Sequence, residues 1–210
     1  GAGQFCTNPG IAVVIDSPAA TAFHAQAKAA VEPTATQTML TDGIASAYRH
    51  GRDRIAGTHG VREVLTTTCD LRNATPYLFA VSGDDWLANH TLGEEVFGPL
   101  GLIVTVRDFA QMQAVAESLE GQLTCTLHVD AGDHAQASAL LPVLARKAGR
   151  VLANGFPTGV EVSEAMVHGG PYPASTNFGA TSVGTMAIRR FLRPVSFQNM
   201  PADLLPDDLR

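Results

Sequence analysis

One cysteine near the start of the chain has the surroundings of a reactive thiol. Cys6 lies in residues 3–10, which run Gly-Gln-Phe-Cys-Thr-Asn-Pro-Gly. Asn-Pro-Gly is typical of a tight turn, because proline fixes φ and glycine accepts a positive φ. The apolar residues 11–15 predict a buried strand, so the thiol is expected on a loop at the mouth of that strand. Its residue type leaves two interpretations open, a nucleophile or a small buried hydrophobic side chain.

A glutamate and an aromatic residue form a second candidate pair. Glu95 and Phe97 lie two positions apart and are followed by Gly-Pro and an apolar segment that begins at Gly101. Because Gly-Pro ends the segment, both side chains could point into a cleft at the mouth of the next strand. The alternative is a loop glutamate beside a phenylalanine that is anchored in the core.

Several common site motifs are missing from the sequence. It has no Gly-x-Gly-x-x-Gly after a strand, no P-loop lysine motif and no Gly-x-Ser-x-Gly. The seven histidines do not have the spacing of metal ligands, so no metal site is expected. A cysteine-protease pair would need a histidine near Cys6 in space, for which His168 is the candidate.

Composition excludes several classes of function. The 210 residues are 45% hydrophobic and 16% charged, which is typical of a globular domain with a well-buried core. A net charge of −6 without a basic cluster argues against nucleic-acid binding, and no apolar run approaches the roughly 20 residues of a membrane span. Three cysteines without Cys-x-x-Cys, and no secretory signal, predict a cytoplasmic protein. The chain lacks an initiator methionine and begins five residues before Cys6, so we expect a piece of a longer protein.

The elements expected to position these residues alternate between strands and helices. Strands are expected at 11–15, 61–67, 77–81, 101–106, 123–129 and 149–154, and helices at 18–31, 37–55, 84–90, from Asp108 and from Asp133. Strand–helix–strand–helix–strand with short links predicts parallel pairing and an α/β fold, with Cys125 in its core. Residues 155–184 lose periodicity and are expected to form a functional or interface loop. A short helix at 185–191, an edge strand at 192–198 and a loose tail are expected to follow.

The motifs together resemble those of the aldehyde dehydrogenase superfamily. Residues 3–10, Glu-Glu-Val-Phe-Gly-Pro at 94–99 and Gly-Arg-Val-Leu-Ala-Asn-Gly-Phe-Pro-Thr-Gly-Val at 149–160 have that family's order and spacing. Three later segments resemble the branch with α-ketoglutarate-semialdehyde (2,5-dioxovalerate) dehydrogenases and NADP-dependent fatty-aldehyde dehydrogenases: 168–176, 181–185 and 190–195. The resemblance covers essentially the whole chain.

This resemblance implies a catalytic domain over residues 1–191 and a C-terminal strand and tail over residues 192–210. The domain is expected to have three layers, with a mostly parallel twisted sheet and helices on both faces. Relatives use the last strand in subunit association, so a homo-oligomer is expected. The family's dinucleotide-binding fold, its general-base glutamate and its oxyanion-hole asparagine lie upstream of the catalytic cysteine. The chain alone is therefore expected to lack useful dehydrogenase activity.

The resemblance also assigns roles to single residues. Cys6 matches the nucleophile that forms a thiohemiacetal and then a thioester with the aldehyde, its backbone N–H meeting the oxyanion. Glu95 matches the glutamate that binds the nicotinamide ribose of NAD or NADP, and Phe97 matches the aromatic residue that positions the nicotinamide. The residues expected to line or close the aldehyde site are Phe5, Thr7, Tyr172 and His168.

The expected substrate is an oxo-acid semialdehyde such as 2,5-dioxopentanoate, which is oxidised to the carboxylic acid. An acidic substrate requires an arginine or several hydrogen-bond donors, and residues 176–178 of the long loop offer little positive charge. A medium or long aliphatic aldehyde is therefore the alternative substrate. A third possibility is a non-catalytic assembly module that keeps the fold and oligomerises through residues 194–198.

Overall fold

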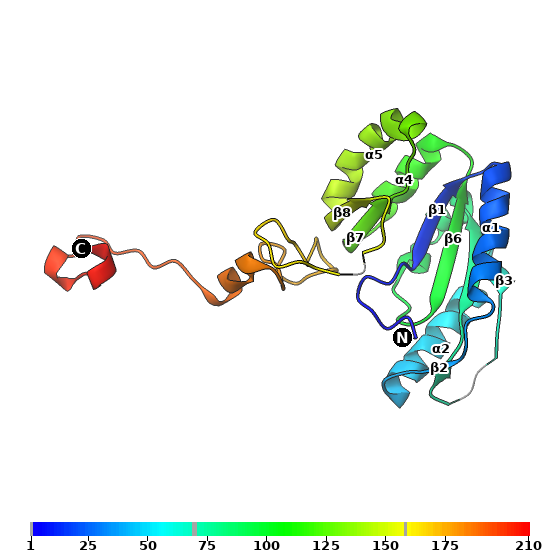
Figure 1. The fold of residues 1–210 in the computed structure, drawn as a ribbon, viewed down its shortest axis with the longest axis horizontal. Helices are drawn as coiled ribbons and strands as arrows, with labels where there is room; N and C mark the ends of the chain where they lie inside the picture. Colours follow the sequence, from blue (N-terminus) through cyan, green and yellow to red (C-terminus); the bar gives the residue numbers. More distant parts are fainter. Residues whose placement is uncertain (1, 69–70, 158) are drawn as a thin grey trace.

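The centre of the molecule is a four-stranded sheet in the order β1-β6-β5-β3 (Figure 1). The computed structural model describes residues 2–68, 71–157 and 159–210. In this sheet β1 (Ile11–Ile15), β6 (Leu100–Val106) and β5 (Tyr77–Ser82) are parallel, and β3 (Arg62–Leu65) is antiparallel to β5. Two further pairs are the parallel β7 (Gln122–Leu127) and β8 (Ala148–Ala153), and the antiparallel β2 (Gln37–Thr38) and β4 (Asn73–Ala74).

Helices cover both faces of the four-stranded sheet. The α-helices are α1 (Pro18–Val31), α2 (Asp42–Ala56), α3 (Gly83–Ala88), α4 (Phe109–Ser118) and α5 (His134–Lys147). Short 3₁₀ helices are η1 (His90–Gly93), η2 (Ala131–Asp133), η3 (Thr185–Phe191), η4 (Ala202–Leu204) and η5 (Asp207–Leu209). Strand β6 shows how the layers form, because Leu102 and Val104 pack toward α2, α3 and α4, whereas Ile103 packs toward α1. The predicted three-layer α/β fold is confirmed.

The helix starts follow from local capping. The Ser17 side chain accepts a hydrogen bond from Ala20 N at 3.1 Å, and Pro18 follows it as the first helical residue. The prediction that the second helix starts at residue 37 was wrong. Thr41 caps α2 by accepting from Ile44 N at 3.1 Å, because residues 37–38 are occupied in pairing with β4.

Asp133 is the N-cap residue of α5 as predicted, but its side chain makes no cap hydrogen bond to this helix. The Asp133 carboxylate accepts from Asp130 N at 2.9 Å and so caps η2, the turn that precedes α5. Cys125, in contrast, packs with the buried residues of α4 and α5 as predicted. Burial raises the pKa of its thiol, which makes it a poor nucleophile. Cys69 lies outside the described residues.

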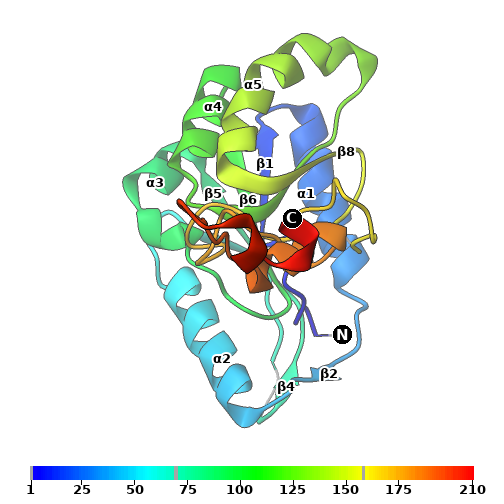
Figure 2. The ribbon, with the colours of Figure 1, turned by 90° about the vertical axis from the view of Figure 1, so that its left-hand side faces the viewer.

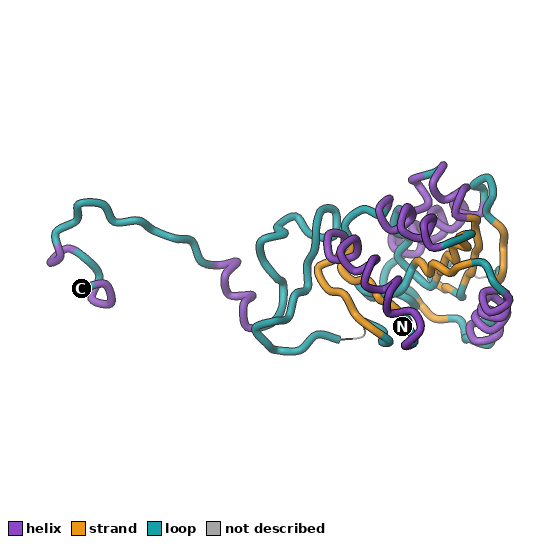
Figure 3. Tube along the Cα trace, turned by 90° about the horizontal axis from the view of Figure 1, so that it is seen from above, coloured by secondary structure: helices purple, strands orange, loops and turns teal. Residues whose placement is uncertain are grey.

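The C-terminal segment leaves the body of the domain in Figure 1 and lies in front of it in the view of Figure 2. The predicted strand at 192–198 does not form, because an isolated strand has no partner for its N–H and C=O groups and Pro194 has no N–H to donate. Viewed from above, the segment after β8 is mostly loop with short helical turns (Figure 3). None of the helices in the described part of the chain is long and apolar enough to span a membrane.

Candidate active site

The candidate site lies at the amino ends of the parallel strands. The Cys6 loop directly precedes β1, and the segment with Glu95 and Phe97 directly precedes β6. Residues 169–172 of the long loop cross the starts of β7 and β8, where Gly121 N donates to Tyr172 O at 3.3 Å. Gly149 is required there, because a Cβ at this position would lie 2.2 Å from Gly169 O. Segments far apart in the sequence therefore meet at one end of the sheets.

The thiol of Cys6 faces an imidazole. Cys6 is exposed, and its Sγ lies 3.4 Å from Nε2 of His168. The long loop fixes His168 through its backbone, since His168 N donates to Thr181 Oγ1 at 2.8 Å and His168 O accepts from Ser182 N at 3.0 Å. The other ring nitrogen, Nδ1, is buried and has no hydrogen-bond partner among the described residues. The imidazole is thus held where Nε2 can accept the thiol proton.

The residues on either side of Cys6 have different surroundings. Phe5 is 49% exposed, and its carbonyl accepts from Asn8 N at 2.9 Å, which closes the turn around Cys6. Thr7 is buried, and its hydroxyl donates to Pro157 O at 2.5 Å. This bond ties the cysteine loop to the start of the long loop after β8.

A second contact joins the cysteine loop to the segment before β6. Gly3 has a φ of +61°, and a Cβ at this position would lie 2.4 Å from the carbonyl of Gly98. Only glycine permits both the left-handed backbone and this close approach. Asn8 Nδ2 also donates to Gly98 O, at 3.4 Å. Neighbouring Pro99 O accepts from the Tyr48 hydroxyl of α2 at 3.3 Å, so this segment is anchored to the core.

The two adjacent glutamates of this segment differ in their partners. Glu94 pairs with Arg54 of α2 at 3.4 Å. Glu95 is exposed, and its carboxylate has no hydrogen-bond or ion-pair partner among the described residues. Phe97 is 37% exposed, so its ring is available on the same segment. Glu95 is therefore free to bind a ligand, whereas Glu94 is engaged in the fold.

Two further residues lie at the long loop, the expected Tyr172 and the unexpected Arg150. Tyr172 is 76% exposed, and it contacts the start of β7 through its carbonyl. Its contact with an aldehyde stays a prediction. Arg150 of β8 was not singled out by sequence reasoning, although its Nη1 donates to Gly159 O at 2.6 Å in the long loop. Its position in an apolar strand, where a charge is unusual, was the available signal.

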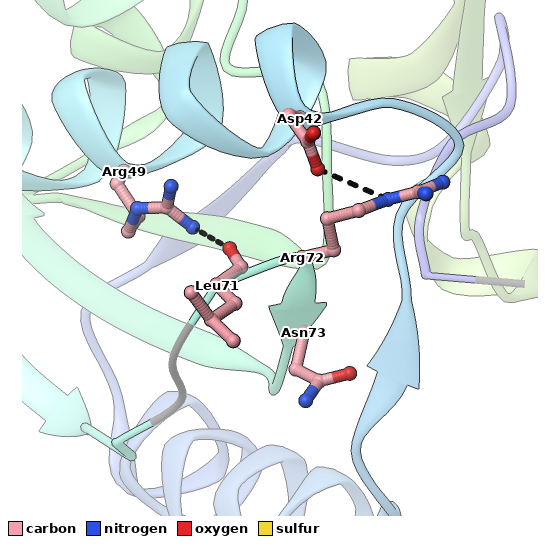
Figure 4. Close-up of a pocket in the computed structure, with 5 residues that line it drawn as sticks. All are labelled: Asp42, Arg49, Leu71, Arg72 and Asn73. Carbon is pink, nitrogen blue, oxygen red and sulfur yellow. Dashed lines mark hydrogen bonds and ion pairs between the residues drawn. The ribbon is translucent and has the colours of Figure 1, made fainter.

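No metal centre adds to this site in the described part of the chain. No group of three or more histidine, cysteine, aspartate or glutamate side chains there could hold a metal ion. A hollow of about 430 Å³ at the start of α2 is lined by Asp42, Arg49, Leu71, Arg72 and Asn73 (Figure 4). Its arginines are engaged, since Arg49 donates to Leu71 O and Arg72 pairs with Asp42 at 3.3 Å. None of the expected site residues lines this hollow.

Curated relatives match the chain along its full length, although no protein-family model matches it. Alpha-ketoglutaric semialdehyde dehydrogenase 2 of Azospirillum brasilense is 51% identical over 215 residues. Alpha-ketoglutaric semialdehyde dehydrogenase of Acinetobacter baylyi is 46% identical over 216 residues. The chain spans only 40% of the length of each of these proteins.

Solved structures share the fold at low sequence identity. A salicylaldehyde dehydrogenase from Pseudomonas putida G7, complexed with salicylaldehyde, has a TM-score of 0.72 at 18% identity, over 94% of this chain and 42% of that one. A succinic semialdehyde dehydrogenase from Streptococcus pyogenes, in complex with NADP+, has a TM-score of 0.71 at 20% identity, over 94% of this chain and 44% of that one. Over all of its own length the chain is therefore similar to these curated alpha-ketoglutaric semialdehyde dehydrogenases, 40% of which it covers, and it shares its fold with solved aldehyde dehydrogenases.

Proposed function

We propose that this chain is the cysteine-bearing part of an NAD- or NADP-dependent aldehyde dehydrogenase that oxidises an oxo-acid semialdehyde to the carboxylic acid. The observation that carries the proposal is the 3.4 Å contact between Cys6 Sγ and His168 Nε2 on an exposed loop. The names of the two curated relatives support the semialdehyde substrate, and the NADP+ complex of one structural neighbour supports the cofactor. A medium or long aliphatic aldehyde is the alternative substrate.

The first step is an addition to the aldehyde. His168 accepts the thiol proton of Cys6, and the thiolate forms a bond to the aldehyde carbon while the carbonyl oxygen takes up the negative charge. The backbone N–H of Cys6 has no hydrogen-bond partner among the described residues, so it can donate to this oxygen. Proton return from His168 to the oxygen completes a neutral thiohemiacetal, and no group is released.

The segment before β6 has the chemistry required to hold the cofactor. When bound, the nicotinamide supplies the acceptor for the hydride that the thiohemiacetal loses as it becomes a thioester. The free carboxylate of Glu95 can accept hydrogen bonds from ribose hydroxyls through both of its oxygens, whereas one oxygen of Glu94 is engaged with Arg54. The partly exposed ring of Phe97 can pack against the nicotinamide. The contact between Gly3 and Gly98 keeps both residues next to the cysteine loop.

Release of the acid requires water to cleave the thioester. Among the described residues, no carboxylate lies within hydrogen-bond distance of the Cys6 thiol or the His168 ring. We therefore propose that this chain captures the aldehyde, and that turnover needs a general base and cofactor contacts from residues outside it.

Aldehyde capture can be tested with butanal labelled with ¹³C at its aldehyde carbon. We expect a ¹³C resonance of a thiohemiacetal on the protein, lost in Cys6→Ser and retained in the matched control Cys125→Ser. A resonance that survives Cys6→Ser, or none in the wild-type chain, would contradict the proposal. The absence of a resonance in the wild-type chain would favour the interpretation that the chain is a non-catalytic assembly module.

A further inference from the structure

Arg150 lies on the face of β8 that is turned away from α5. In the β7–β8 pair, Cys125, Leu127 and Val151 pack with the buried residues of α4 and α5. Side chains alternate along a strand, so Arg150 lies on the opposite face. Thr124 pairs with Arg150 in the parallel register, and Thr126 follows on the same face. Arg150 therefore lies on the same face of the β7–β8 pair as two hydroxyl side chains.

The guanidinium of Arg150 contacts the long loop at two separate residues. Its Nη1 donates to Gly159 O at 2.6 Å and lies 3.8 Å from Met166 Sδ. Gly159 comes two positions after Pro157, which accepts from Thr7, and Met166 comes two positions before His168, which contacts Cys6. Arg150 therefore contacts the long loop at two residues, and each of them is two positions from a residue that contacts the cysteine loop.

The positive charge of Arg150 has no acidic partner among the described residues. The glutamates of the long loop, Glu161 and Glu164, are exposed, and neither forms an ion pair with it. Its Nε is buried and has no hydrogen-bond partner in the described part of the chain. A half-buried charge of this kind is costly unless an anion compensates it. A guanidinium matches a carboxylate best, through two parallel hydrogen bonds.

These observations point to one ligand chemistry, and we propose that Arg150 binds the carboxylate of the aldehyde substrate, with the hydroxyls of Thr124 and Thr126 as further donors. The inference rests on the proposed function and names its substrate class, an aldehyde that carries a carboxylate at its other end. Arg150 thereby supplies the positive charge that residues 176–178 lack. It selects for the semialdehyde over the aliphatic aldehyde.

The test compares two aldehydes of the same length, succinic semialdehyde and butanal, which differ in a carboxylate that replaces a methyl group. The dissociation constant of the thiohemiacetal at Cys6 is measured for each by ¹³C NMR. We expect the wild-type chain to bind succinic semialdehyde about 10-fold or more tightly than butanal, as is typical of charged hydrogen bonds. Arg150→Gln should abolish this preference, because it weakens binding of succinic semialdehyde more than binding of butanal. Arg150→Lys should restore part of it, and the control Arg146→Gln, an exposed arginine of α5, should retain all of it.

Three results would overturn the proposal. An equal loss for both aldehydes in Arg150→Gln would mean that Arg150 only holds the loop. An unchanged preference in Arg150→Gln, or no preference in the wild-type chain, would mean that it does not bind the carboxylate. Thermal unfolding midpoints of all variants identify any that fail to fold. A wild-type chain that captures neither aldehyde would instead contradict the proposed function itself.

Discussion

Sγ of Cys6 and Nε2 of His168 lie 3.4 Å apart although 162 positions separate the two residues in the sequence. The contact is made beyond the amino ends of β1, β7 and β8, which carry the cysteine loop and support the long loop. Ligands of open α/β sheets usually bind at the carboxyl ends of the strands. The candidate site of this chain is thus built from two loops at the opposite end, and its geometry depends on how those loops are held.

Replacing His168 with glutamine is expected to slow alkylation of Cys6 by iodoacetamide at neutral pH by about 10-fold or more, because the side chain can no longer accept the thiol proton. The rate is measured by quenching samples over time and quantifying the modified Cys6 peptide by mass spectrometry. His134→Gln, an exposed position at the start of α5, serves as the control and should react like the wild-type chain. Equal rates for His168→Gln and wild type would show that the imidazole does not assist the thiol.

Gly3→Ala is expected to displace the cysteine loop. The new Cβ would lie 2.4 Å from the Gly98 carbonyl, on a residue whose φ is +61°. Strain of this kind costs about 1–3 kcal/mol, and both the urea midpoint and the rate of Cys6 alkylation should fall. Gly10→Ala in the same loop is the matched control, because its Cβ would meet no atom within 4 Å. If the two variants behave alike, the contact between Gly3 and Gly98 does not hold the loop.

The parts of the fold that depend on local chemistry could be predicted from the sequence. Ser17 and Pro18 predicted the start of α1, and the alternation of apolar residues predicted β7 and the burial of Cys125. The start of α2 could not be placed, because residues 37–38 take their conformation from pairing with β4, which lies far along the chain. The extended state of residues 192–198 likewise depends on whether a partner strand is present.

The candidate site was predictable only in part. Motif resemblance selected Cys6 and Glu95, but neither residue type nor spacing indicated that Glu94 would be engaged by Arg54 and Glu95 left free. The approach of His168 to Cys6 depends on the close passage of Gly169 over Gly149, which no periodicity reveals. Arg150 was missed because its loop partners, Gly159 and Met166, become its neighbours only after folding.

Glu95→Gln is expected to weaken binding of nicotinamide mononucleotide to the chain by about 10-fold, as is typical for the loss of charged hydrogen bonds to ribose hydroxyls. Binding is followed by line broadening of the nicotinamide proton resonances. The neighbouring Glu94→Gln provides the control, since it removes only the exposed ion pair with Arg54, worth at most about 1 kcal/mol of stability. Weaker binding in Glu94→Gln than in Glu95→Gln would reverse the assignment of the two glutamates.

Removing residues 192–210 is expected to leave the thermal midpoint of the domain nearly unchanged. This segment extends away from the sheets, and exposed apolar side chains such as Leu192 and Val195 bury little surface within the chain (Figure 1). Calorimetry of the full and shortened chains measures the difference. Association of the two chains, compared by analytical ultracentrifugation, tests the separate prediction that residues 192–198 pair in an oligomer. A large drop in the midpoint at concentrations where both chains are monomeric would show that the segment packs on the domain.

His24 on α1 is expected to make the stability of the domain depend on pH. Its Nε2 lies 3.1 Å from Thr105 Oγ1, its Nδ1 is buried without a partner among the described residues, and burial followed by the nearby Arg62 charge lowers its pKa below 6.5. The unfolded chain, with a histidine pKa near 6.5, therefore binds the proton more readily than the folded chain. The free energy of unfolding should be highest above pH 6.5, the histidine pKa of the unfolded chain. It should fall as the pH drops below 6.5 toward the lower pKa of the folded state. Urea unfolding at about pH 7.5 and about pH 5 measures the loss, and His24→Gln should lose less stability than the wild-type chain over the same interval. Identical losses in both proteins would assign the acid sensitivity to other groups.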